Sequence, residues 1–289
     1  MKRETKKTKK TNTVSTMVYL KIFVVVFVVL VIASLAFKFI KMITDSRLKL
    51  STYTVLIVNS DAYLMQVKNS THEESILKIS RYGQTAKSQS RLSNSIAFGI
   101  PIDGEIFDEA NVFNGDPQAL FNFSNLISVF LGGRSLKFTN MNEVDFAKIY
   151  TNIGSVTQKN SDSQTLPDFN DAYIKNKDKT NNLVYQMFKS QDILNDITSV
   201  EIINATEVDG AGAKVAQMLK NAGYNVLAVS SSDKPDKSKI VIRVDNPLLE
   251  KRFKLLFNMP IEKMKEQHIA DVTIVLGRDL AQEIERIPN

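Results

Sequence analysis

The sequence predicts a mixed α/β (α+β) protein that is attached to a membrane by one N-terminal helix. Residues 22–37 form an apolar run without a charge, which predicts a membrane span over 18–43. Short β-branched segments then alternate with segments of helical spacing, which predicts a mixed α/β fold for the remainder. We divide that remainder into a mixed domain at 51–153, a linker and helix at 154–198, and a C-terminal domain at 199–280.

The span is long enough to cross a bilayer. About 20 helical residues cover the hydrocarbon core, and Lys21, Lys38 and Lys41 can extend toward the lipid headgroups. Backbone groups in lipid must bond to one another, so the segment should be helical despite its many valines. A cleaved signal peptide is the alternative, because residues 34–36 resemble a cleavage site. The run is longer than the ~7–15 apolar residues of a signal peptide. We therefore expect residues 18–43 to have the lipid bilayer as their partner.

Charge predicts which way the chain points. Residues 1–17 carry six basic residues and one acid, and basic flanks stay in the cytoplasm. We expect a cytoplasmic tail at 1–17, one pass through the cell membrane, and an extracytoplasmic remainder. Residues 1–47 hold ten basic and two acidic residues, and the whole chain carries +6, so residues 48–289 carry −2. No nucleic-acid partner is expected there. The tail as a nucleic-acid arm is an alternative, but topology and anionic lipid also explain its charge.

Residue types limit the chemistry further. The chain has no cysteine, so an external domain must rely on ordinary cores. Its two histidines, His72 and His268, are far apart in sequence. This predicts neither a zinc or iron site nor a Ser-His-Asp arrangement. We therefore expect no metal and no cofactor.

The segment 51–153 and the residues after it show both periodicities. β-Branched or alternating runs predict strands, and apolar residues at helical spacing predict helices. The expected strands are 53–58, 63–67 and 75–79, and the expected helices are 90–98, 117–131 and 143–150. Residues 154–182 are polar, which predicts a linker or a long loop. A helix is expected over 183–196.

The C-terminal segment has the clearest pattern. Its expected strands are 200–203, 224–229, 239–244 and 271–276, and its expected helices are 210–222 and 247–258. This β-α-β-β-α-β order is that of split ferredoxin-like folds. Gly210 and Gly212 open the first helix, where bare backbone amides would bind an anion. The interpretation we favour is a tight strand-to-helix turn with Asp209 as the helix N-cap. Asp209 and Glu207 would also repel an anion.

Two stretches of this segment resemble the LytR C-terminal domain of bacterial envelope proteins. They are VEIINATEVDGAGAKVAQMLKNAGYNV at 200–226 and ADVTIVLGRD at 270–279. The features that carry the resemblance are a strand, Asn-x-Thr, a Gly-x-Gly helix start, an Ala-Gly-Tyr turn and a terminal Val-Leu-Gly-x-Asp. The resemblance implies a protein of the cell envelope and cell wall.

The segment before it is similar to the catalytic domain of LytR-CpsA-Psr proteins. That family transfers glycopolymers from a polyprenyl-pyrophosphate carrier to peptidoglycan with a divalent metal. Asp61 and Arg81 match two positions of its motifs and are the remnant catalytic candidates. Ser80 replaces the motif proline, and Tyr82 replaces the motif acid. Residues 143–152 lack the arginines that clamp pyrophosphate. The resemblance therefore implies a degenerate or divergent catalytic domain.

Three functions compete at this point. The first is a non-catalytic envelope protein that binds cell-wall glycan or an envelope partner. The second is a divergent glycopolymer phosphotransferase that uses Mg²⁺ with Asp61 and Arg81. The third is a membrane-bound regulator whose tail contacts nucleic acid, although so short a tail has no reading helix. The sequence favours the non-catalytic envelope protein, because a well-matched C-terminal domain follows a segment in which most residues of the catalytic motifs are replaced.

Overall fold

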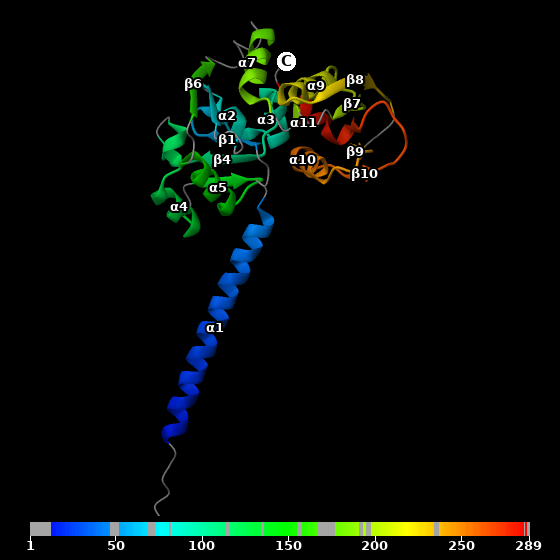
Figure 1. Ribbon diagram of the computed structural model, residues 1–289. Helices are drawn as coiled ribbons and strands as arrows, with labels where there is room; N and C mark the ends of the chain where they lie inside the picture. Colours follow the sequence, from blue (N-terminus) through cyan, green and yellow to red (C-terminus); the bar gives the residue numbers. More distant parts are fainter. Residues whose placement is uncertain are drawn as a thin grey trace, which may run out of the picture. The chain divides into compact units, whose positions relative to one another are not determined.

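In the computed structural model, the chain divides into two compact units, Met1–Asp45 and Ser46–Asn289. The first contains α1 (Thr13–Asp45), drawn in blue in Figure 1. Within α1, Val18–Thr44 is long and apolar enough to cross a membrane, by length and composition. The expected apolar helix is therefore present. The structure describes residues 13–46, 52–68, 73–80, 82–113, 116–133, 136–154, 158–166, 177–190, 193–194, 198–233, 237–285 and 287.

The second unit, as far as it is described, contains two mixed sheets. The first sheet has the order β5-β4-β1-β2-β3-β6. The pairs β1–β2, β2–β3 and β4–β5 are antiparallel, and β1–β4 and β3–β6 are parallel. The strands are β1 (Thr52–Val58), β2 (Ala62–Lys68), β3 (Glu73–Ile79), β4 (Gly104–Asp108), β5 (Leu136–Thr139) and β6 (Gln158–Leu166).

Helices cover both faces of this sheet. Every residue of β1 is buried, and the two sets of alternate side chains enter different cores. Tyr53, Val55 and Ile57 join the core beside α4 and α5. Leu56 and Val58 join the core beside α2, α3 and α7. The helices of this part are α2 (Gly83–Ser88), α3 (Arg91–Phe98), η1 (Pro117–Leu120), α4 (Phe123–Phe130), α5 (Glu143–Gly154) and α7 (Lys177–Phe188).

Residues 117–131 do not form the single helix that their spacing predicts. They form η1, a short 3₁₀ helix, and then α4. Asn122 separates the two, because its backbone is extended (φ −120°, ψ 165°) and its side chain accepts a hydrogen bond from the Asn125 amide at 2.8 Å. An asparagine N-cap of this kind begins a new helix.

The polar residues 154–182 also differ from the expected linker or loop. They include β6, which pairs in parallel with β3 at the sheet edge. The helix expected over 183–196 is α7, which begins earlier and ends at Phe188. The Phe188 carbonyl accepts a hydrogen bond from Gln66 Nε2 at 2.8 Å. This satisfies one of the carbonyls that every helix end leaves open.

The second sheet has the order β10-β9-β11-β7-β8. Its strands are β7 (Ser199–Asn204), β8 (Asn225–Ser231), β9 (Lys239–Ile242), β10 (Ile261–Lys263) and β11 (Val272–Leu276). The helices of this part are α9 (Ala211–Ala222), α10 (Pro247–Phe257), η2 (Arg278–Leu280) and α11 (Ala281–Glu285). The predicted β-α-β-β-α-β order is confirmed, with β10 added before the last strand.

The split ferredoxin-like arrangement is wrong. In a split unit another strand lies between the two parallel strands, whereas β7 and β8 pair directly. β11 adds parallel to β7 on the other side. This direct pairing leaves β8 at the sheet edge, and α9 packs against both β7 and β8.

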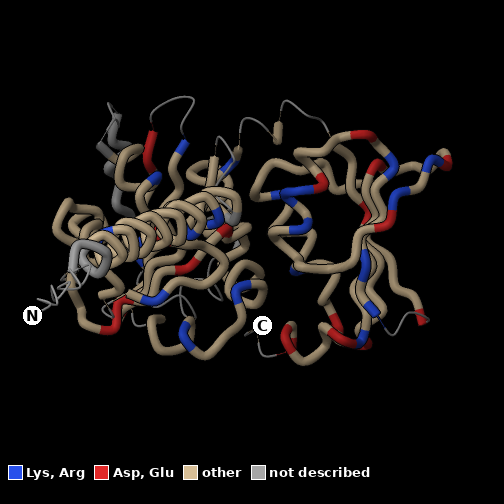
Figure 2. Tube along the Cα trace, turned by 90° about the horizontal axis from the view of Figure 1, so that it is seen from below, with Lys and Arg blue, Asp and Glu red and all other residues tan. Residues whose placement is uncertain are grey.

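Helices between the sheets join the second unit into one body. α9 contacts both α3 and α7 (Figure 1). One buried cluster includes Leu56 of β1, Phe98 of α3, Met218 of α9 and Phe253 of α10. Basic and acidic residues are interspersed over this unit (Figure 2), which fits its small net charge. The boundaries predicted at 51–153, 154–198 and 199–280 stay predictions.

Candidate functional site

Asp61, the first remnant catalytic candidate, lies in an ion pair. It sits in the turn between β1 and β2, and its Oδ2 is 2.8 Å from Nζ of Lys78 on β3. The hydrogen bond to Asp61 raises the pKa of Lys78. A carboxylate in such a pair has part of its charge compensated. Arg81, the second candidate, lies outside the described residues.

Gly210 and Gly212 have different local roles at the start of α9. Gly210 is the N-cap with φ +74°, a conformation that glycine adopts freely, and no side chain caps this end. The expected N-cap at Asp209 is therefore wrong. A Cβ on Gly212 would lie 2.8 Å from Val229 Cγ1, so glycine is needed for α9 to approach the sheet. The anion site at these glycines stays a prediction.

The other residues of the C-terminal pattern bond to their own loops. Asn204 Oδ1 accepts hydrogen bonds from the amide and hydroxyl of Thr206, at 3.1 and 2.7 Å. At the far end, Asp279 Oδ1 accepts from the amide and hydroxyl of Ser238, at 2.9 and 2.5 Å. A Cβ on Gly277 would lie 2.6 Å from the Ser238 amide nitrogen. These positions build the turns at the strand ends.

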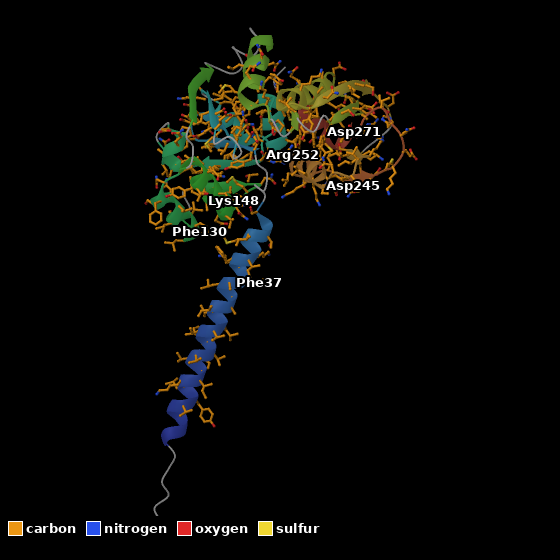
Figure 3. The ribbon with its side chains drawn as sticks, viewed as in Figure 1. Phe37, Phe130, Lys148, Asp245, Arg252 and Asp271 are labelled. Carbon is orange, nitrogen blue, oxygen red and sulfur yellow. The ribbon has the colours of Figure 1, made fainter. Side chains whose placement is uncertain are left out.

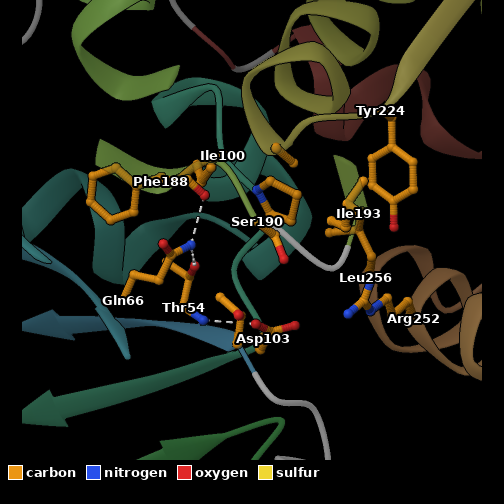
Figure 4. A pocket seen from close by; sticks show the side chains of 13 residues that line it. Thr54, Gln66, Ile100, Asp103, Phe188, Ser190, Ile193, Tyr224, Arg252 and Leu256 are labelled. Atoms are coloured by element: carbon orange, nitrogen blue, oxygen red, sulfur yellow. Dashed lines mark hydrogen bonds between the residues drawn. The ribbon is translucent and has the colours of Figure 1, made fainter. Parts of the chain in front are cut away.

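A pocket lies between the first sheet and the ends of α7, α9 and α10, and we call it the inter-sheet pocket (Figure 4). Its cavity volume is about 50 Å³, enough for a few water molecules. Typical ligand pockets are far larger, at ~300–1,000 Å³. The lining residues are Thr52, Thr54, Gln66, Ile100, Pro101, Asp103, Phe188, Ser190, Ile193, Ala222, Tyr224, Arg252 and Leu256.

Two buried polar atoms in this pocket lack a partner among the described residues. Gln66 is 3% exposed, and its Nε2 donates to Thr54 Oγ1 at 3.2 Å and to the Phe188 carbonyl at 2.8 Å. Its Oε1 accepts no hydrogen bond, and the Ser190 hydroxyl, on a residue 5% exposed, makes none. Buried polar atoms are normally satisfied by protein or ordered water. Water or a small ligand carrying hydrogen-bond donors would complete both groups.

Asp103 and Arg252 supply the charges of the pocket. The Thr54 amide donates to Asp103 Oδ2 at 2.8 Å. Burial of the carboxyl group raises the pKa of Asp103 to about 6, although the Thr54 amide and the charges of Arg91 and Arg252 lower it. Figure 4 shows the Asp103 and Arg252 side chains on the same side of the pocket. The pocket therefore gains or loses a negative charge close to neutral pH.

Glu105 is a second acid with a raised pKa, and it lies on β4, two residues after Asp103. It is 2% exposed, and Asn94 Nδ2 donates to its Oε1 at 2.9 Å. Burial raises the pKa of Glu105 to about 7, although the Asn94 hydrogen bond and the Arg91 charge lower it. Arg91 itself donates to the carbonyls of Ile102, at 2.5 Å, and Leu256, at 2.9 Å. These bonds tie α3 to the residues just before β4 and to α10.

Sequence reasoning missed the four residues that supply the charges and the unpartnered polar atoms of the inter-sheet pocket, which are Gln66, Asp103, Ser190 and Arg252. The sequence did contain one signal for a polar site near Asp103. Residues 100–106 place two acids among isoleucines at alternating positions. Acids on an apolar strand segment are seldom buried without partners, so this pattern indicates a polar site.

The phosphotransferase alternative requires side chains that bind Mg²⁺, and the described residues do not supply such a set. Among the residues that the structure describes, no group of three or more His, Cys, Asp or Glu side chains could hold a metal ion. Asp61 is paired with Lys78 instead. Since Mg²⁺ prefers carboxylate and other oxygen ligands, these residues do not fit a magnesium site.

Comparison with known proteins identifies the C-terminal segment. Residues 197–280 match the family model described as LytR cell envelope-related transcriptional attenuator, which confirms the resemblance seen in that segment. No curated protein matches the chain. Among solved structures, the chain is similar to the Lin1025 protein from Listeria innocua, with 12% identity, a TM-score of 0.20, and coverage of 67% of this chain and 86% of that one. The family match and the apolar helix fit a membrane-anchored protein of the cell envelope.

Proposed function

We propose that the chain is an extracytoplasmic envelope protein that binds cell-wall glycan or an envelope partner and performs no catalysis. The observation that carries the proposal is the LytR C-terminal domain at 197–280 in a chain with an apolar helix near its N-terminus. The basic tail at 1–17 supports an orientation in which the N-terminus is cytoplasmic.

The geometry of the remnant motif supports binding over catalysis. Transfer from a polyprenyl pyrophosphate requires arginines or a carboxylate-bound metal to hold several negative charges. Asp61 is paired with Lys78, and the inter-sheet pocket of about 50 Å³ has no room for a polyprenyl chain. No cofactor is needed by the function proposed here.

Orientation has a direct test, because the chain lacks cysteine. A single cysteine at the exposed Ile269 (67% exposed) should react with a membrane-impermeant maleimide on intact cells. A single cysteine in place of Thr8, in the basic tail, should react only after lysis. The reverse pattern, or labelling of neither site before lysis, would contradict an extracytoplasmic second unit.

Binding is tested by sedimentation of the full-length protein, in mild detergent, with purified peptidoglycan carrying its attached glycopolymers. The control is residues 1–45 fused to an unrelated soluble domain, since it retains the basic tail and the span. We expect retention above this control. Equal retention of the two proteins on wall material, with no envelope protein crosslinked to the full chain in cells, would reject the proposal.

The phosphotransferase alternative predicts turnover of a polyprenyl-pyrophosphate glycan in the presence of Mg²⁺. It also predicts that Asp61→Asn and Arg81→Ala lower the rate. We expect no turnover above background by the wild-type chain. Turnover that both substitutions reduce would replace the binding proposal with the enzymatic one.

A further inference from the structure

Helix α4 exposes an apolar face to solvent. Phe123 is 65% exposed, Ile127 43%, Phe130 42% and Leu131, which follows the helix, 81%. Their spacing places them on one side of a helix, and we call this set the outer face of α4. The opposite side holds Val129, which is buried in the core. Large exposed apolar patches mark interaction sites.

The outer face carries no charge. The sequence of α4 is FSNLISVF, without an acidic or basic residue. Transfer of this surface into lipid or into another protein would therefore desolvate no ion, which is the usual obstacle to burial. The chemistry of the face fits an apolar or interfacial partner and gives no basis for recognition of a charged one.

The outer face belongs to the part of the second unit where the chain enters from α1. Ser46, the residue directly after α1, is 3% exposed, and its hydroxyl donates to Asp145 Oδ1 at 2.6 Å. Lys148 Nζ donates to the Ser46 hydroxyl at 2.5 Å. Asp145 and Lys148 lie on α5, and α4 packs against α5. Figure 3 shows Lys148 and Phe130 on these two neighbouring helices.

Chain length places this entry point close to the lipid headgroups. From Phe37, the end of the apolar run, to Ser46 the chain advances nine residues, or about 13 Å along a helix. The headgroup layer outside the hydrocarbon core is itself ~5–8 Å thick. α4 packs against α5, the helix that holds Ser46, and the axes of packed helices lie about 8–10 Å apart.

We propose that the outer face of α4 inserts into the interface of the bilayer as a second membrane contact, in addition to α1. The inference rests on the proposed function, because it requires α1 to be a membrane anchor. Phenylalanine and leucine on one side of a helix are typical of helices that lie in the interface plane. The anchor keeps lipid permanently at high local concentration, which favours lipid over a soluble partner. Such a contact would restrict the orientation of the second unit above the membrane.

The absence of tryptophan from the chain allows a clean test. Single-tryptophan variants Phe130→Trp, Leu131→Trp, Ile269→Trp and Phe37→Trp of the full-length protein are reconstituted into nanodiscs with either ordinary or brominated phosphatidylcholine. Bromine quenches tryptophan only on close approach. Phe37→Trp reports on the anchor, and Ile269→Trp is the matched exposed control at a site remote in sequence from α4.

We expect bromolipid to quench Phe130→Trp and Leu131→Trp and to shift their emission to the blue relative to Ile269→Trp. Quenching of Phe37→Trp alone would overturn the inference and leave the anchor intact. No quenching at Phe37 would instead reject the membrane anchoring of the proposed function. A blue shift at Phe130 without bromolipid quenching would show that protein covers the face, and would also overturn the inference. Unchanged circular dichroism of either α4 variant establishes that it is folded.

Discussion

Replacement of Glu105 by glutamine should stabilise the second unit at alkaline pH and leave it unchanged in acid. Glu105 lies on β4 and is 2% exposed. Burial raises its pKa from 4.5 to about 7, although the hydrogen bond from Asn94 and the Arg91 charge lower it. Between these two pH values the folded chain holds a proton that the unfolded chain has released.

The sign and size of the effect follow from this proton. Because the folded state binds more protons from pH 4.5 to 7, the free energy of unfolding falls as pH rises, by about 1.4 kcal/mol per pH unit. Above pH 7 the buried carboxylate therefore costs about 3 kcal/mol. A glutamine keeps the acceptor for Asn94 Nδ2. It also offers a donor to Asn94 Oδ1, which has no partner among the described residues. We expect Glu105→Gln to gain about 3 kcal/mol at pH 8 and close to nothing at pH 4.

Urea unfolding of the full-length protein in mild detergent, followed by tyrosine fluorescence, measures this difference. The matched control is Glu109→Gln, which removes an exposed acid paired with Lys137 at 2.7 Å. Its effect should stay within about 0.5 kcal/mol at both pH values. A gain for Glu105→Gln that is equal at pH 4 and pH 8, or no gain at pH 8, would refute the assignment of a buried carboxylate with a raised pKa.

Three further predictions concern substitutions at four positions, two of them a matched pair of glycines. Gly212→Ala should lower the free energy of unfolding by about 1–3 kcal/mol, because its Cβ would lie 2.8 Å from Val229. Gly210→Ala, which has open space but φ +74°, should cost about 1 kcal/mol; the opposite ranking in urea unfolding would contradict the packing argument. Asp61→Asn should cost at most about 1 kcal/mol and leave retention on wall material unchanged, and a lost retention would place Asp61 in the binding site. Ser190→Ala should change stability by less than about 1 kcal/mol, and a larger loss would indicate that bound water or ligand uses the hydroxyl.

Local signals in the sequence predicted most elements, because they act within one turn of chain. The helix expected over 90–98 is α3, and Ser90 caps it by accepting a hydrogen bond from the Ser93 amide at 3.1 Å. Gly223 ends α9 in the left-handed region, with φ +106°. The same kind of signal at Asn122 was outweighed by the apolar spacing on either side, and the predicted helix was therefore too long.

Strand order could not be predicted in the same way. The order of elements in the C-terminal segment allows both a split sheet and the observed direct pairing of β7 with β8. In the observed sheet α9 packs against both β7 and β8. A Cβ at Gly212 would lie 2.8 Å from Val229 Cγ1 in this packing, but a glycine in sequence is equally compatible with a turn or an anion site.

In this chain, resemblance to a family motif indicated polar sites less well than acidic residues placed among apolar ones. Asp61 was singled out by resemblance, yet it lies in a partly exposed ion pair whose removal should cost little. Asp103 and Glu105 match no motif, but burial raises the pKa of each toward neutrality. An acid on an apolar strand segment must be either neutralised or paired when the chain folds, and that requirement can be recognised in the sequence alone. Their burial links the folding of the second unit to proton binding, from pH 3.8 to about 6 for Asp103 and from pH 4.5 to about 7 for Glu105.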